Sequence, residues 1–180
     1  MRHLGRLSLL GMFGAVGCLG GIAGAQTPAQ ATDVCTLLRA KEVEKTLGQP
    51  VAEGTPSSRE LPASGGTEDR CTWETTAPNT GFLADTRLQL VLSLQSNCAR
   101  PDPKGCFRSD KQLHESKHEE KDLKKIRGRE AFYVFTGEVE VLTGKRILNA
   151  HFNNFDTNMF GRKDFERRTV DAATRAVKRL

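Results

Sequence analysis

The chain has 180 residues, of which 27 are Lys or Arg and 22 are Asp or Glu, giving a formal net charge of +5. This length suits one domain of ordinary size. Because acidic and basic residues alternate through most of the chain, the charge pattern indicates a solvated surface and argues against the single-sign field of a nucleic-acid-binding protein.

The first 25 residues have the pattern of a cleaved secretory signal peptide. Residues 1–6 carry positive charge, residues 7–16 form an apolar stretch too short to span a bilayer, and Ala23-Gly24-Ala25 supplies small residues before a cleavage site. We therefore predict export to the periplasm or the extracellular space. The mature chain would consist of a polar tether at 26–32 and a single domain at 33–180, with no transmembrane helix.

A lipid anchor is the alternative interpretation of this leader. Ala15-Val16-Gly17-Cys18 resembles a lipobox, in which Cys18 would be lipidated and become the first residue of the mature protein. A lipobox usually has Leu where Ala15 stands, so the cleaved signal peptide is the leading interpretation.

Four cysteines remain in the mature chain: Cys35, Cys71, Cys98 and Cys106. In an oxidising compartment an even count predicts disulfides. Two prolines and a glycine between Cys98 and Cys106 turn the chain back on itself, which favours a 98–106 pair together with a 35–71 pair. Metal binding by the thiols is the competing interpretation, but the sequence contains no Cys-x-x-Cys.

The N-terminal half predicts a helix followed by a strand. Asp33 can cap a helix over 33–47, which Gly48 and Pro50 would end, although the helix can instead break near Arg39-Ala40 into two short turns. Residues 53–70 are rich in Gly, Ser and Pro and predict a mobile loop. A strand follows at 71–75, and a 35–71 disulfide would place Trp73 beneath the crossing of helix and sheet.

The remaining elements are mainly strands between two helices. Leucines at every second position predict a half-buried strand over 87–95, and similar patterns predict strands at 131–135, 138–142 and 146–152, the first of them led by Gly128. Helices are predicted over 109–126, with few apolar residues, and over 163–180. An antiparallel sheet with helices packed on it, an α+β fold, is the natural class.

Several short motifs resemble a family of small secreted or lipid-anchored bacterial domains of unknown function. They are Asp33-x-Cys35-x-Leu37-Leu38, Glu42-Val43-Glu44, 47–51, Cys71-Thr72-Trp73 and the glycine-led segment 126–132. The resemblance implies a PsbP-like α/β/α sandwich, similar to non-catalytic lipoproteins and accessory subunits, with no catalytic motif to transfer. The chain departs from the family pattern near Arg129, where a second glycine is usual, and in its 98–106 cysteine loop.

One motif could carry catalysis. His114-Glu115-Ser116-Lys117-His118 is a formal HExxH match on a predicted helix, where His114 and His118 could hold zinc while Glu115 activates water. Glu138 or His151 could act as a third ligand. Zinc-protease helices are apolar around this motif, whereas charged residues surround it here, so a zinc-dependent hydrolase is the alternative and not the leading prediction.

Two other surfaces could bind ligands. His151 lies between Asn149 and Asn153 on one strand face, near Asp156, and could belong to a polar ligand patch. Basic residues at 121–129 and along the last helix could bind anionic surface polymers, although acids interleave with them. Phe155, Met159 and Phe160 could dock a partner or close the core.

Because no nucleophile elbow or phosphate-binding glycine loop occurs, we expect a non-catalytic exported binding or interaction module of the cell envelope. Its partner would be an envelope protein or a small ligand. We expect no cofactor and a monomer.

Overall fold

The computed structural model describes residues 33–61, 66–79, 86–96, 102–117, 120–123, 125–134, 136–154 and 162–180. The chain divides into two units, Met1–Gln30 and Ala31–Leu180, and all described residues belong to the second. The predicted signal peptide, the tether and Cys18 therefore lie outside the described residues.

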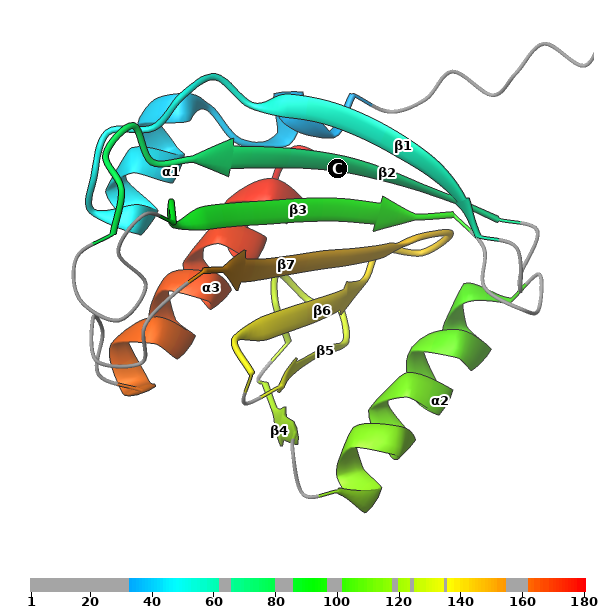
Figure 1. The fold of residues 1–180 in the computed structure, drawn as a ribbon. Helices are drawn as coiled ribbons and strands as arrows, with labels where there is room; N and C mark the ends of the chain where they lie inside the picture. Colours follow the sequence, from blue (N-terminus) through cyan, green and yellow to red (C-terminus); the bar gives the residue numbers. More distant parts are fainter. Residues whose placement is uncertain are drawn as a thin grey trace, which may run out of the picture. The chain divides into compact units, whose positions relative to one another are not determined.

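Within the described residues, seven strands form one antiparallel sheet in the order β1-β2-β3-β7-β6-β5-β4 (Figure 1). Two meanders, β1 to β3 and β4 to β7, meet where β3 pairs with β7. The strands are β1 (Thr55–Leu61), β2 (Gly66–Glu74), β3 (Gln89–Gln95), β4 (Glu120–Asp122), β5 (Ala131–Val134), β6 (Glu138–Leu142) and β7 (Ile147–Asn153).

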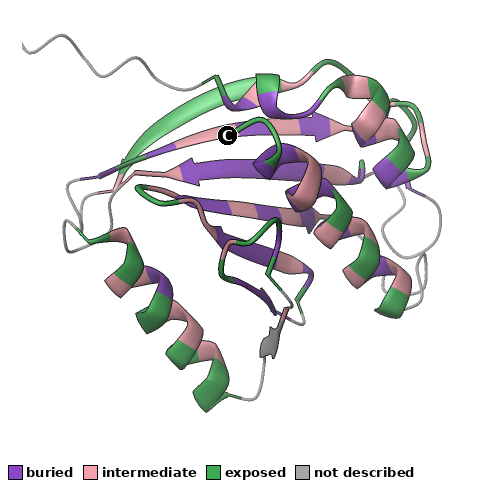
Figure 2. Cartoon of the chain, turned by 180° about the vertical axis from the view of Figure 1, so that it is seen from behind, coloured by how far each residue is buried: buried purple, intermediate pink, exposed green. Residues whose placement is uncertain are grey.

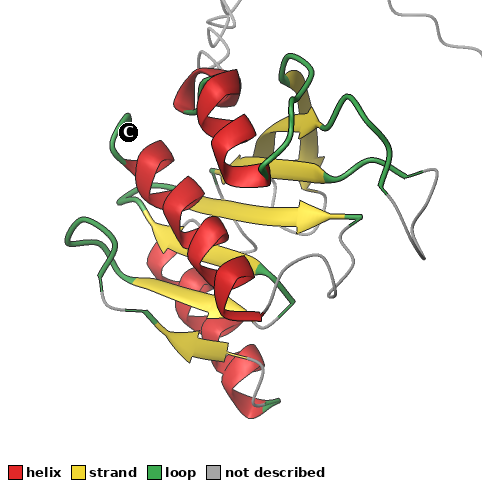
Figure 3. Ribbon diagram, turned by 90° about the vertical axis from the view of Figure 1, so that its left-hand side faces the viewer, coloured by secondary structure: helices red, strands yellow, loops and turns green. Residues whose placement is uncertain are grey.

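Helices lie on both faces of this sheet. The elements η1 (Val34–Leu37), α1 (Ala40–Leu47) and α3 (Arg162–Val177) lie on one face, and α2 (Pro103–Ser116) packs against β6 and β4 on the other. Figure 3 shows α1 and α3 in front of the strands and α2 behind them. The predicted α+β class is thus confirmed, whereas the PsbP-like assignment stays a prediction.

The main core lies between the sheet and the helices η1, α1 and α3. Leu90, Leu92 and Leu94 of β3 all point into it, as the period-two pattern predicted. The prediction that this strand is half-buried is wrong, because Val91 and Ser93 on its other face are buried as well. From α3, Phe165 packs on Phe152 of β7 with ring centroids 4.9 Å apart. A smaller apolar cluster lies beneath α2 and contains Phe107, Phe132, Val134 and Ile147.

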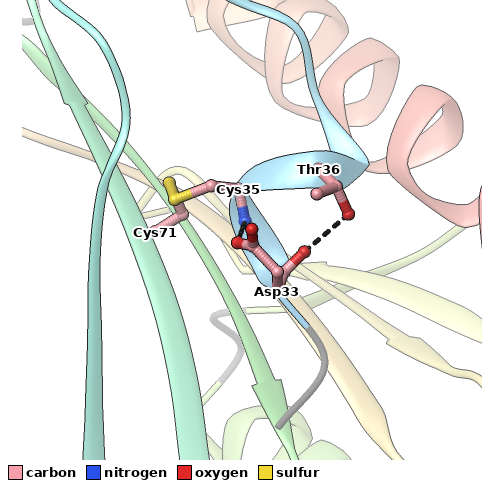
Figure 4. The surroundings of a disulfide bond; sticks show 4 residues. All are labelled: Asp33, Cys35, Thr36 and Cys71. Atoms are coloured by element: carbon pink, nitrogen blue, oxygen red, sulfur yellow. Dashed lines mark hydrogen bonds between the residues drawn. A yellow bond between two sulfur atoms is a disulfide. The ribbon is translucent and has the colours of Figure 1, made fainter.

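The predicted Cys35–Cys71 disulfide is present and joins η1 to β2, with the two Cα atoms 5.1 Å apart (Figure 4). Asp33 caps η1: its Oδ1 accepts the N–H of Cys35 at 3.0 Å, and its carbonyl accepts the Thr36 hydroxyl at 2.7 Å. Trp73 is buried in the same core. Cys98 lies outside the described residues, so its pairing with Cys106 stays a prediction.

The first helix breaks, as the sequence allowed. Leu38, which ends η1, and Arg39, which precedes α1, both have extended backbone. Gly48 then ends α1 in the left-handed conformation (φ 76°), where glycine has no steric penalty.

Two predictions about element boundaries are wrong. The helix predicted over 109–126 spans Pro103–Ser116, because Asp102 accepts the Lys104 N–H and Pro103 occupies the first turn. The loop predicted over 53–70 instead contains β1 and the start of β2. Figure 2 shows that β1 is exposed along nearly all its length, so no hydrophobic alternation marks it; cross-strand pairing alone makes it a strand.

Gly128 does occupy the turn that leads into β5. Arg127 and Gly128 both have positive φ (51° and 82°), and Ile126 pairs with Arg129 across them. Positive φ at both central residues is typical of a type I′ hairpin turn, and glycine fits its second position without strain.

Arginines of the last helix bind carbonyls near the beginning of the domain. Arg168 Nη1 donates to the Thr46 carbonyl at 2.6 Å, at the C-terminal end of α1. Arg179, just beyond α3, donates to the Leu37 carbonyl at 2.8 Å and pairs with Glu42 at 2.9 Å. The first and last described elements of the chain are therefore fixed to each other.

Candidate functional site

A continuous set of polar side chains lies on the sheet face opposite η1, α1 and α3. Because side chains alternate along a strand, the residues next to the buried leucines and valines point to this second face. The pairing register aligns Arg70, Ser93, Asn149 and Glu140 across β2, β3, β7 and β6, and places His151 opposite Glu138 in the adjacent row. We call these six residues the polar face.

Asn149 connects the two rows. Its Nδ2 donates to Glu138 Oε1, and its Oδ1 lies 3.0 Å from Nδ1 of His151. Because an amide oxygen only accepts hydrogen bonds, His151 must carry its proton on Nδ1, which leaves Nε2 as an acceptor. Burial lowers the pKa of His151; Glu138 opposes this shift, and Arg70 adds to it. The imidazole is thus neutral near pH 7.

Glu140 is the most unusual member of the polar face. Glu140 is only 7% exposed, and its Oε2 atom is buried and without a hydrogen-bond partner among the described residues. Burial raises the pKa of Glu140 well above the ordinary value, and the neighbouring carboxyl groups of Asp110 on α2 and Glu138 on β6 raise it further, while Asn149 opposes them. Glu140 therefore retains a proton at a pH where an exposed glutamate is ionised.

The opposite end of the polar face is basic and well paired. Arg70 Nη2 donates to Glu68 Oε1 at 3.1 Å, and Arg59 of β1 also pairs with Glu68. Burial opposes ionisation of Glu68, but the bonds from Arg70 and Arg59 outweigh it and hold the pKa of Glu68 below its ordinary value. The two ends of the face thus differ: on β2, Glu68 pairs with two arginines, whereas the carboxyl groups of Glu138 and Glu140 on β6 pair with none among the described residues.

The structure describes only part of the HExxH motif, with His114 and Glu115 in the last turn of α2. The helix ends at Ser116 and Lys117 is its C-cap, so α2 does not extend to His118, which lies outside the described residues. Glu115 forms a surface pair with Lys111 at 3.5 Å. The other predicted ligands, Glu138 and His151, belong to the polar face. Across the described ranges, no group of three or more His, Cys, Asp or Glu residues is arranged to hold a metal ion.

The basic side of α3 is largely compensated by acids. Arg168 and Arg167 both pair with the half-exposed carboxylate of Asp164, and their hydrogen bonds to it lower its pKa. A surface pocket of about 180 Å³ between α1 and α3 is lined by Lys45, Thr46, Arg167, Arg168, Asp171 and Arg175. Paired, half-exposed charges of this kind form a solvated surface, as the interleaved sequence predicted.

Sequence reasoning identified part of the polar face. It placed Asn149, His151 and Asn153 on one strand face, and β7 does so, with the side chain of Asn153 3.3 Å from that of Gln89. It did not identify Arg70, Ser93 or Asp110, because only the strand register and the position of α2 bring them to this face. Asp156, Phe155, Met159 and Phe160 lie outside the described residues.

Two further findings bear on identity. In the part of the chain that the structure describes, no helix is long and apolar enough to cross a membrane. Comparison of the chain with protein-family models, with curated proteins and with solved structures finds no match in any of the three.

Proposed function

We propose that this chain is a non-catalytic binding module of the cell envelope and that its ligand binds at the polar face. The observation that supports this most is the row of polar side chains from Arg70 to Glu140, which crosses four strands. A sheet face with only a structural role would be either apolar and covered or charged and exposed. The Cys35–Cys71 disulfide is consistent with an oxidising, exported compartment.

The chemistry of the polar face favours binding. His151 Nε2 can accept a hydrogen bond, protonated Glu140 can donate one, and Glu138, whose Oε1 accepts from Asn149, has a second oxygen that can accept another. The network through Asn149 holds these groups in fixed orientations, so little side-chain freedom is lost when a ligand binds. Among the described residues, no serine or cysteine is hydrogen-bonded to His151, and its Nδ1 is already bonded to Asn149.

The test is ligand enrichment from an envelope extract. Purified protein is incubated with small molecules extracted from the envelope, filtered, and the retained compounds are identified by mass spectrometry. His151→Trp fills the polar face. Lys163→Trp is the matched control, because Lys163 is exposed on α3, on the other side of the sheet. Thermal unfolding of both variants checks that they are folded.

We expect a compound that wild type and Lys163→Trp retain and that His151→Trp loses. Equal retention by the two variants would place the binding site elsewhere and contradict the proposal. The rival zinc hydrolase is tested on protein purified without a histidine tag: stoichiometric zinc together with a peptidase activity that Glu115→Gln abolishes would replace the binding module with an enzyme.

A further inference from the structure

A pocket of about 250 Å³ lies between α2 and the edge of the sheet formed by β4 and β5. Three segments line it: one side of α2, residues just after β4, and residues 130 and 131, where β5 begins. Figure 1 shows α2 beside this edge of the sheet. None of the six residues of the polar face lines this pocket, so it is a separate feature of the molecule. We call it the α2 pocket.

Apolar side chains form part of its wall. Phe107 of α2 is 2% exposed, Ala131 of β5 is 7% exposed, and Leu123 is partly buried. Ligand pockets in proteins combine apolar walls with a few polar groups that fix the orientation of the ligand. The α2 pocket therefore offers a surface for the apolar part of a ligand.

The charged residues of the α2 pocket are mostly cationic. Arg108, Lys111 and Lys125 stand against a single acid, Glu130. Lys111 pairs with Glu115 at 3.5 Å, but Glu115 does not line the pocket. Among the described residues, neither Arg108 nor Lys125 forms an ion pair. Like charges gathered around one space repel each other, and a bound anion would offset that repulsion.

The basic pocket between α1 and α3 differs in this respect. There Arg167 and Arg168 are both paired with Asp164, and Arg168 also donates to the Thr46 carbonyl. Their N–H groups are thus already used within the protein, whereas those of Arg108 and Lys125 are available to a ligand.

We propose that the α2 pocket binds a small organic anion with an apolar body, such as a carboxylate on an aromatic ring or on a short acyl chain. The anionic group would accept charge-assisted hydrogen bonds from Arg108, Lys111 and Lys125. The body would contact Phe107 and Leu123. Pockets for drug-sized ligands have volumes of about 300–1,000 Å³, so a ligand of the α2 pocket should be smaller than these. This second site goes beyond the proposed function, which concerns the polar face.

Four probes separate the two parts of such a ligand. 2-Naphthoate and octanoate carry the same anionic group on a ring and on an acyl chain, 2-naphthamide has the shape of naphthoate without its charge, and inorganic phosphate is an anion without an apolar body. Binding is measured on the purified protein by titration of amide and methyl chemical shifts at pH 7.5 and low salt, because 0.1 M salt screens exposed charges beyond about 10 Å. We expect a carboxylate probe to shift the methyl signals of Leu123 and Ala131. Naphthamide and phosphate should each bind at least tenfold more weakly, and the tighter carboxylate identifies the body as a ring or an acyl chain.

A pair of double variants tests the cations. Arg108→Gln/Lys125→Gln should weaken binding of the carboxylate at least fivefold. Lys104→Gln/Lys163→Gln is the matched control, because it removes the same charge from two exposed residues of α2 and α3 that do not line the pocket, and we expect a change of less than twofold. His151→Trp should leave this binding unchanged.

Four results would overturn the proposal: no shifts at Leu123 or Ala131 with either carboxylate, naphthamide or phosphate binding as tightly as the carboxylates, equal losses in the two double variants, or loss of binding in His151→Trp. The comparison of naphthoate with naphthamide uses the unaltered protein, so it holds even if a variant folds poorly. The polar face is tested separately, by the enrichment experiment with His151→Trp, and either site can fail while the other stands.

Discussion

Replacing Cys35 and Cys71 together with alanine should greatly destabilise the domain. The disulfide closes a loop of 36 positions between η1 and β2. The chain-entropy relation gives roughly 3.8 kcal/mol for a loop of this size at 25 °C, against a total stability of about 5–15 kcal/mol for a domain. For a domain of this length, such a loss corresponds to a drop in melting temperature of roughly 10 °C.

Trp73 makes the measurement direct. It is the only tryptophan, it is 2% exposed, and it lies on the same strand as Cys71, so its fluorescence follows unfolding of the core. Urea titrations of wild type and Cys35→Ala/Cys71→Ala give the difference in unfolding free energy. Cys98→Ala/Cys106→Ala is the control, because the predicted loop there is much shorter and should cost less. A difference below about 1 kcal/mol between wild type and the first variant would refute the loop-closure reasoning.

Three further predictions test other parts of the fold. Folding raises the pKa of Glu140, so above pH 4.5 the folded state binds more protons than the unfolded state, and the free energy of unfolding should fall as pH rises. Glu140→Gln should remove this fall, and at pH 8 the variant should unfold at a higher urea concentration than wild type. Gly137→Ala should cost roughly 2–4 kcal/mol, because Gly137 has φ 97° and a Cβ would clash with the ring of Phe165; a change below 1 kcal/mol in urea titrations would contradict this. Arg168→Ala should destabilise the fold by about 1–2 kcal/mol, because it loses the hydrogen bond to the Thr46 carbonyl of α1, whereas Arg167→Ala should cost less than about 0.5 kcal/mol. Equal effects of the two substitutions in thermal unfolding would show that the bond to α1 does not stabilise the fold.

The sequence predicted those parts of the fold that local chemistry determines. The period-two leucines predicted β3, the turn at Gly128 predicted the entry to β5, and Cys35 and Cys71 were paired correctly. It failed for β1, whose exposed side chains have no hydrophobic pattern, and for the boundaries of α2, where the Asp102-Pro103 start was taken as part of a cysteine loop.

The candidate site could be predicted only in part, for a different reason. Asn149 and His151 share one strand, so their spacing shows that they lie on one face. Arg70 and Glu140 join them through the β2–β3 and β6–β7 pairs. Ser93 joins them because β3 pairs with β7 in one particular register. A shift of one residue in that register would move Ser93 to the core face, and no local pattern in a single sequence specifies such a long-range alignment.

The link between the two ends of the domain has a consequence for when the chain can fold. Arg179 binds the carbonyl of Leu37 across a separation of 142 residues, and Arg168 binds that of Thr46 across 122. A ribosome releases the N-terminal segment first, yet the partner groups of η1 and α1 emerge only with α3 and the residues just after it. Contacts of such separation slow folding, and here they cannot form until α3 and the residues just after it have been synthesised.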